Sequence, residues 1–380
     1  MNRYFYYHIF YVGMMNIMLF IPHILIQERF GGAVSGLLTA MAVGTALSWI
    51  TTSCFERFPG MGAPEIMKKY LPYWMASVVL SASTAILISG GVLALYSFTR
   101  TMSIFFNPDM NDYVFLALVA FASVCAGSRS SRSVQFTLEI LIVVISPLAF
   151  ILLYKSLTDS SVNWDAMRVV AGYVRKRPTF ESVAAATFLY SGHMNIALFN
   201  RLHPKGFKIR HKWLIPLICC FFAFFSFFIP IGFHGTMAVD QYVFLWSVTS
   251  DSMQMQYGFV QRVLFTFLIL FCVLSLMFTM ITFHGAMEFI KSLRPRHLPQ
   301  TEQWPVPKIN WILCGLFGIL SFFYTAWANE YRNQWAVMVW LECRFIMEIL
   351  TALIMLTLVL AARKGWRRNA SSGGSAAWGK

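Results

Sequence analysis

The chain has 380 residues, of which 58% are hydrophobic, 17% aromatic and 12% charged, and its formal net charge is +14 at pH 7. A soluble domain carries about a quarter charged residues, so this composition excludes a large soluble domain and indicates a polytopic membrane protein. The basic residues cluster between apolar runs, which favours anionic membrane lipid as their partner, and no interleaving of aromatic and basic residues indicates nucleic acid.

Ten apolar runs are each about long enough to cross a ~30 Å hydrocarbon core at a rise of about 1.5 Å per residue. They lie at 4–26, 33–55, 74–98, 113–126, 134–154, 182–199, 213–237, 258–283, 310–328 and 335–362. Each is predicted to be a helix, because unpaired backbone groups are costly in lipid. We therefore expect an all-α, transporter-like transmembrane domain of about ten helices over 1–366 and a disordered cytoplasmic tail over 367–380.

The distribution of basic residues predicts the orientation. Of the 30 Lys and Arg residues, 20 lie in the two terminal segments and the even-numbered connections, and 8 lie in the odd-numbered ones. By the positive-inside rule, both termini face the cytoplasm. The connection at 155–180 departs from this pattern with five basic residues on the predicted outer side, so it either binds something acidic or contains a missed span. Its apolar spacing also predicts an amphipathic helix.

Motifs for enzymes and metal sites are absent from the sequence. The seven cysteines have no C-x-x-C spacing, the eight histidines are scattered, and there is no Walker A loop, H-E-x-x-H or G-x-S-x-G. We expect no catalytic residue, no metal site and no cofactor.

Splitting the ten runs five and five makes the first and sixth counterparts in an inverted repeat, in which broken helices hold substrate at mid-membrane. Each contains a glycine beside polar residues, in Tyr11-Val12-Gly13-Met14-Met15-Asn16 and in Tyr190-Ser191-Gly192-His193-Met194-Asn195. One interpretation is that both helices unwind there and bind the ammonium and carboxylate of an amino acid. The other is that the glycines permit close helix packing. The predicted substrate-binding residues are Gly13, Met14, Asn16, Tyr96, Tyr190, Ser191, Gly192 and His193.

Three residues outside these two runs have two interpretations each. Tyr96, near the end of the third run, either closes the binding site or is a membrane-interface tyrosine. Arg344 and Glu348 are four residues apart in the tenth run and share one helix face. They form either an internal ion pair that fixes the packing of the bundle or part of an ion or proton path.

The most specific string follows the second run and reads Glu56-Arg57-Phe58-Pro59-Gly60-Met61-Gly62-Ala63-Pro64-Glu65-Ile66, with Lys68, Lys69, Tyr70 and Leu71 after it. It predicts a turn at Pro-Gly and a short amphipathic helix that starts at Pro64. On an inner loop of a ten-span chain, this string resembles the B subunits of nutrient germinant receptors of endospore-forming bacteria. These belong to the spore germination branch of the amino acid/polyamine/organocation transporter superfamily. Gly13 and Gly192 match the positions where that superfamily holds substrate, whereas His193-Met194-Asn195 departs from the family.

The resemblance implies a subunit of the spore inner membrane that acts with an A subunit and a lipoprotein C subunit. A small-molecule nutrient such as an amino acid would shift its conformational equilibrium and trigger germination. One alternative is an amino acid permease coupled to H⁺ or Na⁺, and another is a purely structural membrane subunit. The first and sixth runs contain no acidic residue, which disfavours simple proton coupling.

Overall fold

A computed structural model of the chain describes residues 2–17, 19–204, 206–253, 262–294 and 305–373. Helices account for most of these residues, which form no β-strand. Seven of the helices in the described ranges are long and apolar enough to cross a membrane. The predicted all-α polytopic membrane protein is therefore confirmed.

The ten predicted runs fall on helical segments, although residue 18 of the first run and residues 258–261 of the eighth lie outside the described part. The first and sixth runs are interrupted, and the seventh has a non-helical backbone at Gly235. The first five runs correspond to α1 (Asn2–Met15) with α2 (Ile21–Gln27), α3 (Ala33–Phe55), α5 (Tyr73–Phe105), α6 (Asp112–Gly127) and α7 (Ser131–Thr158). The last five correspond to α9 (Phe180–Thr187) with the 3₁₀ helix η2 (Phe188–Asn195) and α10 (Ile196–Phe199), α11 (Leu214–Ala238), α13 (Val263–Ser292), α14 (Lys308–Trp327) and α15 (Glu330–Gly373). The connections contain α4 (Ala63–Tyr70), α8 (Trp164–Ala171), η1 (Gly172–Arg175), η3 (Asn200–Leu202), η4 (Val239–Gln241) and α12 (Leu245–Ser252).

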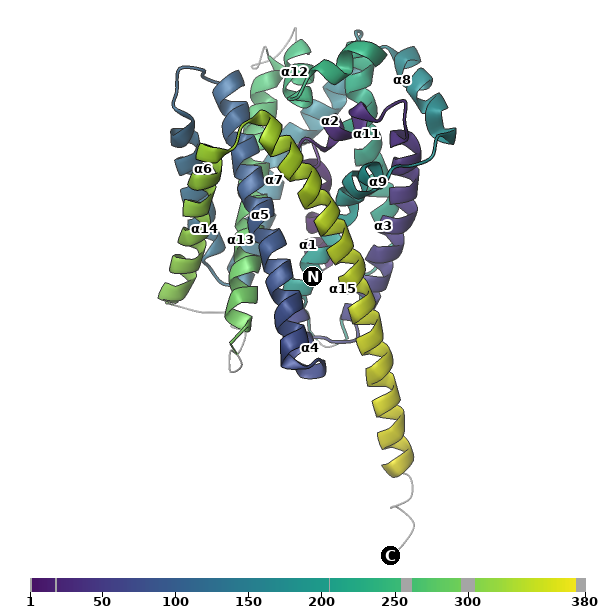
Figure 1. Cartoon of the computed structure of the whole chain (residues 1–380), viewed down its shortest axis with the longest axis vertical. Coiled ribbons are helices and arrows are strands. Elements are labelled where there is room, and N and C mark those ends of the chain that lie inside the picture. The colour runs from purple at the N-terminus through teal and green to yellow at the C-terminus, as the bar shows by residue number, and fades with distance from the viewer. Residues whose placement is uncertain (1, 18, 205, 254–261, 295–304, 374–380) are drawn as a thin grey trace, which may run out of the picture.

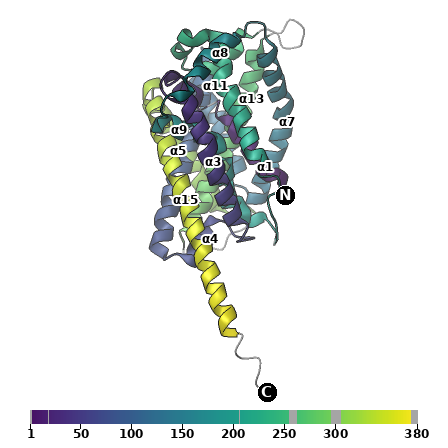
Figure 2. The same ribbon diagram turned by 90° about the vertical axis from the view of Figure 1, so that its right-hand side faces the viewer.

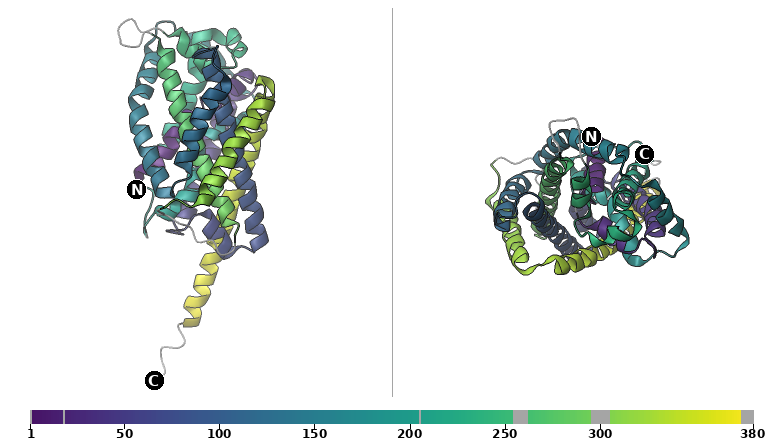
Figure 3. Two further views of the ribbon diagram at one scale, coloured as in Figure 1. Left: turned by 90° about the vertical axis from the view of Figure 1, so that its left-hand side faces the viewer. Right: turned by 90° about the horizontal axis from the view of Figure 1, so that it is seen from above.

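The long helices run side by side along the long axis of the molecule (Figures 1 and 2). α4 lies at one end of the bundle, and α8 and α12 lie at the other; we call these the α4 end and the α8 end (Figure 1). α15 crosses the bundle obliquely and extends beyond its α4 end (Figure 3). It continues to Gly373, into the tail expected at 367–380, and residues 374–380 lie outside the described part.

Large apolar side chains cover the outside of the bundle. Phe121, Phe150 and Phe323 are 71%, 71% and 69% exposed, on α6, α7 and α14. By contrast, 72% of the most apolar stretch of α13 is buried inside the bundle. A surface of this kind is unfavourable in water and matches a hydrocarbon environment, which supports a multi-pass membrane protein.

The Phe-Pro-Gly string folds as its sequence predicts. Gly60 has a left-handed backbone with φ of 75°, and α4 follows with Pro64 in its first turn. Glu65 lies in that first turn, and Lys68 and Lys69 lie in the last, where each charge is favourable with respect to the helix dipole.

A buried polar network ties this string to the rest of the α4 end. Asn200 Nδ2 lies 3.2, 2.9 and 2.8 Å from the carbonyl oxygens of Phe55, Phe58 and Met61. Beside it, Arg201 forms ion pairs with Glu65 at 3.1 Å and with Glu288 of α13 at 2.6 Å, and Lys291 lies 2.5 Å from Glu288. The loop, α4 and the end of α13 are therefore held as one unit.

The basic connection at the α8 end contains a helix and no additional span. Ala166, Met167 and Val170 form the buried face of α8, which packs on α11. The backbone N–H of Asn163 donates to the Gly232 carbonyl over 2.9 Å. The amphipathic helix is thus present, and its apolar face covers the protein.

Removal of the Asn200 amide is expected to destabilise the α4 end. Asn200→Ala leaves three carbonyl oxygens without their shared donor, so we expect a loss of about 1–3 kcal/mol, measured by thermal unfolding in detergent. Asn200→Asp keeps the shape of the side chain but places a carboxylate against the same carbonyls, so its loss should be at least as large. An Asn200→Asp variant as stable as the parent protein would contradict this role.

Candidate functional site

The first predicted span is interrupted after α1. α1 ends at Met15, Phe20 has a left-handed backbone with φ of 57°, and α2 starts with Pro22 in its first turn. Proline lacks an N–H and its ring clashes with the carbonyl four residues earlier, so the helix cannot continue through Pro22. The span is broken as predicted, but the predicted unwinding at Gly13 is wrong, because Gly13 lies inside α1.

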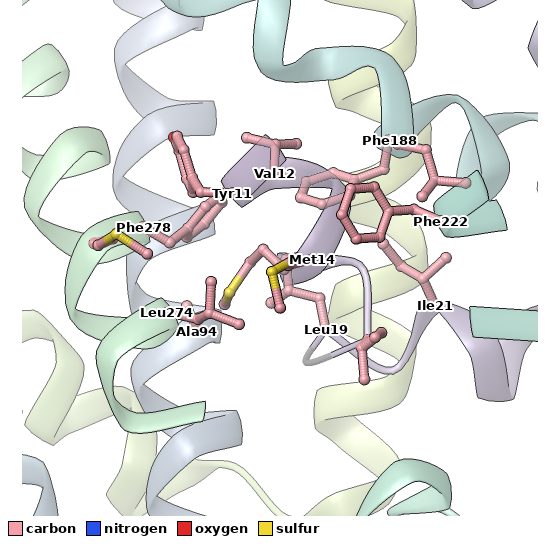
Figure 4. Close-up of a cluster of buried hydrophobic side chains, with 14 of the residues drawn as sticks. Tyr11, Val12, Met14, Leu19, Ile21, Ala94, Phe188, Phe222, Leu274 and Phe278 are labelled. Carbon is pink, nitrogen blue, oxygen red and sulfur yellow. The ribbon is translucent and has the colours of Figure 1, made fainter. Parts of the chain in front are cut away.

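Apolar side chains enclose this break. Figure 4 shows Met14 beside side chains from three other helices, Ala94, Phe222 and Leu274. Asn16 is fully buried, and neither atom of its amide has a hydrogen-bond partner within the described ranges. Met14 and Asn16 are therefore buried in the core, while Ile17, Phe20 and Pro22 beyond them line a small separate pocket.

The sixth predicted span changes from an α-helix to the 3₁₀ helix η2 at Phe188. In a 3₁₀ helix three residues complete a turn, so side chains three positions apart lie above one another. η2 therefore presents three rows of side chains: Tyr190 with His193; Leu189 with Gly192 and Asn195; and Phe188 with Ser191 and Met194.

The first row faces α3. The Tyr190 ring occupies the space where Gly44 would otherwise carry a Cβ. One turn further along α3, Ser48 Oγ lies 3.0 Å from His193 Nδ1, which is also 2.7 Å from the Tyr190 carbonyl oxygen. Because a carbonyl only accepts hydrogen bonds, Nδ1 carries the proton that is donated to it. Tyr190 and His193 thus fix η2 to α3.

The second row faces α1. A Cβ at Gly192 would lie 2.5 Å from the His8 carbonyl oxygen and 2.7 Å from Ile9 Cα, so the backbones of η2 and α1 are in direct contact. Asn195 Nδ2 donates to Tyr11 Oη over 3.1 Å. These contacts explain why a glycine is needed at position 192.

The third row lines a cavity inside the bundle. The centre of a water-sized sphere can occupy about 140 Å³ of this cavity, and its walls come from α1, α4, α5, η2, α10, α13 and α15. Phe188 stands at its wall with Phe278 and Trp340, whose ring centroids lie 6.1 and 5.8 Å away. Ala63 and Met67 of α4 also line it, so the cavity reaches from η2 to the Phe-Pro-Gly string.

Arg344 joins α15 to the point where the sixth span changes helix type. The Phe188 N–H bonds to Ala185 in the 3₁₀ pattern, which releases the Ala184 carbonyl from its α-helical partner. Arg344 Nη2 donates to that carbonyl oxygen over 2.7 Å and to Thr187 Oγ1 over 3.0 Å. The Thr187 hydroxyl of the same helix also donates to this carbonyl over 2.8 Å, so Arg344 and Thr187 together replace the lost backbone partner.

The other side of the Arg344 guanidinium faces Glu348 and Ser191. Nη1 lies 2.9 Å from Glu348 Oε1 and donates to Ser191 Oγ. Both charged side chains line the cavity. The internal ion pair predicted from the spacing of the tenth run is thus present, and it forms part of the cavity wall.

Among the predicted binding residues, Ser191 lines this cavity. Tyr96 lines a separate outer pocket with Arg100 and Glu330. On α5 it lies nine residues beyond Leu87, a cavity residue, which is about 13 Å along a helix. Tyr96 is therefore not placed to close the cavity in this conformation.

The remaining predicted residues take structural positions outside the cavity lining. Gly13 packs against the Phe222 ring, Met14 lies in the core cluster of Figure 4, and Tyr190 with His193 faces α3. Most of the cavity lining is absent from the predicted binding residues, and α15 contributes the longest row, which consists of Trp340, Arg344, Met347, Glu348 and Thr351. Of these, the sequence singles out Arg344 and Glu348, but as an ion pair or an ion path. The spacing of three and four along this row is the signal for one helix face.

No protein-family model matches the chain, and no curated protein matches it.

Substitution of the two matched glycines should affect stability unequally. Gly192→Ala places a Cβ against the α1 backbone, whereas Gly13→Ala meets the Phe222 ring, which can rotate. Overpacking costs about 1–3 kcal/mol, so we expect a lower melting temperature in detergent for both variants and the larger loss for Gly192→Ala.

Gly315→Ala on α14 is the matched control, because a Cβ there meets nothing within 4 Å. Its melting temperature should be unchanged or higher, since alanine favours helix. A Gly192→Ala variant as stable as this control would show that η2 and α1 do not pack as described.

Proposed function

We propose that this chain is a nutrient-sensing subunit of the germinant receptor type and binds a small molecule such as an amino acid within the bundle. The observation that carries the proposal is the cavity beside the 3₁₀ segment of the sixth span, in which the centre of a water-sized sphere can occupy about 140 Å³. Apolar pockets with a few converging polar groups are the usual sites for small ligands. In this cavity the polar groups include Ser191, Asn195, Arg344 and Glu348.

The resemblance of the Phe-Pro-Gly string supports the receptor assignment. The string continues into α4, whose Ala63 and Met67 line the cavity. A ligand in the cavity would therefore contact α4, the helix into which the string continues. By its different affinity for two arrangements of this helix, the ligand would shift their equilibrium.

The same resemblance supplies the cellular setting of the proposal. The protein would lie in the spore inner membrane with both termini in the cytoplasm, where it would act with an A subunit and a lipoprotein C subunit. Basic residues of the inner connections, such as Lys68 and Lys69, would face anionic lipid headgroups there.

A second candidate function is an amino acid permease coupled to H⁺ or Na⁺. It is favoured by Glu348, an acidic residue in the cavity wall, because a buried carboxylate next to a substrate site suits proton or cation coupling. The two functions differ in whether the bound ligand is released on the other side of the membrane.

Ligand binding is tested by thermal unfolding of the purified protein with a mixture of L-amino acids. Ligand at about 100 times its Kd stabilises the folded state by about 2.7 kcal/mol, so the melting temperature should rise. Met347→Trp adds a bulky ring to the cavity wall and should abolish this rise. Leu350→Trp, at a 41% exposed position of α15, is the matched control and should preserve it.

Uptake of labelled amino acids into liposomes containing the protein then separates the two functions. Thermal stabilisation without uptake supports the receptor subunit. Uptake that follows an imposed ion gradient supports the permease. If no amino acid stabilises the parent protein, or if Met347→Trp responds as the parent does, the cavity is not an amino acid site.

A further inference from the structure

We infer that Arg344 and Glu348 bind the two charged ends of the ligand, and that this ligand is an α-amino acid with an apolar side chain. The inference rests on the proposed function and deepens it. It places the charged contacts on α15 rather than at the matched glycines of the first and sixth spans. The guanidinium of Arg344 takes the ligand carboxylate, and the carboxylate of Glu348 takes the ligand ammonium.

The first argument is the position of the pair. Arg344 and Glu348 lie one turn apart on α15, line the same cavity, and have side chains that are 6% and 4% exposed. Their charges are opposite and their nearest atoms are 2.9 Å apart. The wall thus offers one cationic and one anionic group at adjacent points, which is the pattern that complements a zwitterion.

The second argument is that both groups have unused hydrogen-bonding capacity. Arg344 Nε has no hydrogen-bond partner in the described part of the chain. Glu348 Oε1 has Arg344 Nη1, at 2.9 Å, as its one partner among the described residues, which leaves a further lone pair unused. A buried ion pair is favourable only when further hydrogen bonds satisfy its remaining donors and acceptors.

An amino acid supplies what each group lacks. Its ammonium provides three N–H donors for the carboxylate of Glu348, and its carboxylate provides acceptors for the guanidinium of Arg344. Charge-assisted bonds of this kind are about twice as strong as neutral ones. The Ser191 hydroxyl, which accepts a hydrogen bond from Arg344, lies beside the charged pair and offers the ligand a further polar contact.

The third argument is the character of the remaining wall. Phe188, Phe278, Trp340, Met347, Leu80 and Ile281 surround the charged pair with apolar surface. A charged ligand side chain would lose its hydration here and meet only uncharged hydroxyl and amide groups, because each charge of the wall already faces one end of the ligand. An apolar side chain is stabilised there by burial.

The matched glycines are less suitable for the same contacts. Gly192 lies against the backbone of α1, and Gly13 lies inside α1 against Phe222. Neither glycine is among the described residues that line the cavity. A ligand in the cavity therefore meets the charged pair without displacing these helix contacts.

The test compares three probes of one shape by isothermal titration calorimetry in detergent. They are leucine, its decarboxylated amine 3-methylbutylamine, and its deaminated acid 4-methylpentanoate. Each analogue leaves one charge of the wall unpaired, so the parent protein should bind leucine at least about tenfold more tightly than either one. Glutamate, which adds a charge, should also bind at least about tenfold more weakly than leucine.

Glu348→Gln should lower the affinity for leucine by at least about tenfold while retaining the affinity for 4-methylpentanoate. Arg344→Gln should likewise lower the affinity for leucine by at least about tenfold, but it should retain the affinity for 3-methylbutylamine. The ratio of affinities within one variant does not depend on how much of the preparation is folded. Glu288→Gln is the matched control, because Glu288 is equally buried, pairs with Arg201 at 2.6 Å and lies outside the cavity lining.

The outcomes distinguish this inference from the proposed function. If the parent protein binds leucine and the Glu348→Gln and Arg344→Gln variants keep the parent ratios, the charged pair does not contact the ligand and the proposed function stands. Tighter binding of the amine or of the acid than of leucine would overturn the zwitterion assignment. If neither leucine nor any other amino acid binds the parent protein, the proposed function fails, and this inference fails with it.

Discussion

The structure depends on how an interrupted helix satisfies its backbone inside a membrane. A carbonyl released from its helical partner finds no water in hydrocarbon, so a side chain must replace that partner. At the start of η2 this partner is Arg344, whose guanidinium bonds to the Ala184 carbonyl. Further along, Cys219 of α11 lies 3.2 Å from the Leu189 carbonyl oxygen and Ser48 of α3 holds His193. Three helices thus converge on one short segment, with α15 and α11 bonding to its backbone and α3 bonding to the His193 side chain.

This arrangement decides which part of η2 is free to meet a ligand. Most of two of its three rows is occupied by close contacts with α1 and α3, which leaves the row of Phe188, Ser191 and Met194, together with Asn195 at the end of the row that faces α1, for the cavity. The Arg344 guanidinium, which bonds to the backbone before η2, also forms part of the cavity wall. Under the proposed function, a ligand that bonds to Arg344 would draw on the same donor group as the interrupted segment. Ligand binding and the geometry of η2 would then be coupled through one side chain.

The sequence predicts the ten runs and the helix at Pro64, because long apolar stretches and a proline after a Pro-Gly turn impose local structure that packing does not change. It does not predict which residues of an interrupted span face the cavity. Around Gly192, the 3₁₀ period places Ser191 in the cavity and turns Tyr190 and His193 toward α3. In the first span, Pro22 shifts the break beyond Gly13. Both outcomes follow from backbone geometry, whereas the prediction rested on composition near a glycine.

The two buried ion clusters differ in what they allow to move. Arg201 joins Glu65 of α4 to Glu288 of α13, with side chains that are 1%, 15% and 3% exposed. Separation of such a buried pair costs about 3–5 kcal/mol, so α4, η3 and the end of α13 are constrained to move together. The pair of Arg344 and Glu348 lies within one helix, so a shift of α15 relative to η2 keeps those two charges together but breaks the hydrogen bonds from Arg344 to Ala184, Thr187 and Ser191. Under the proposed function, a ligand carboxylate would compete for the same guanidinium, so the contact between α15 and η2 is the place where ligand binding would act on the bundle.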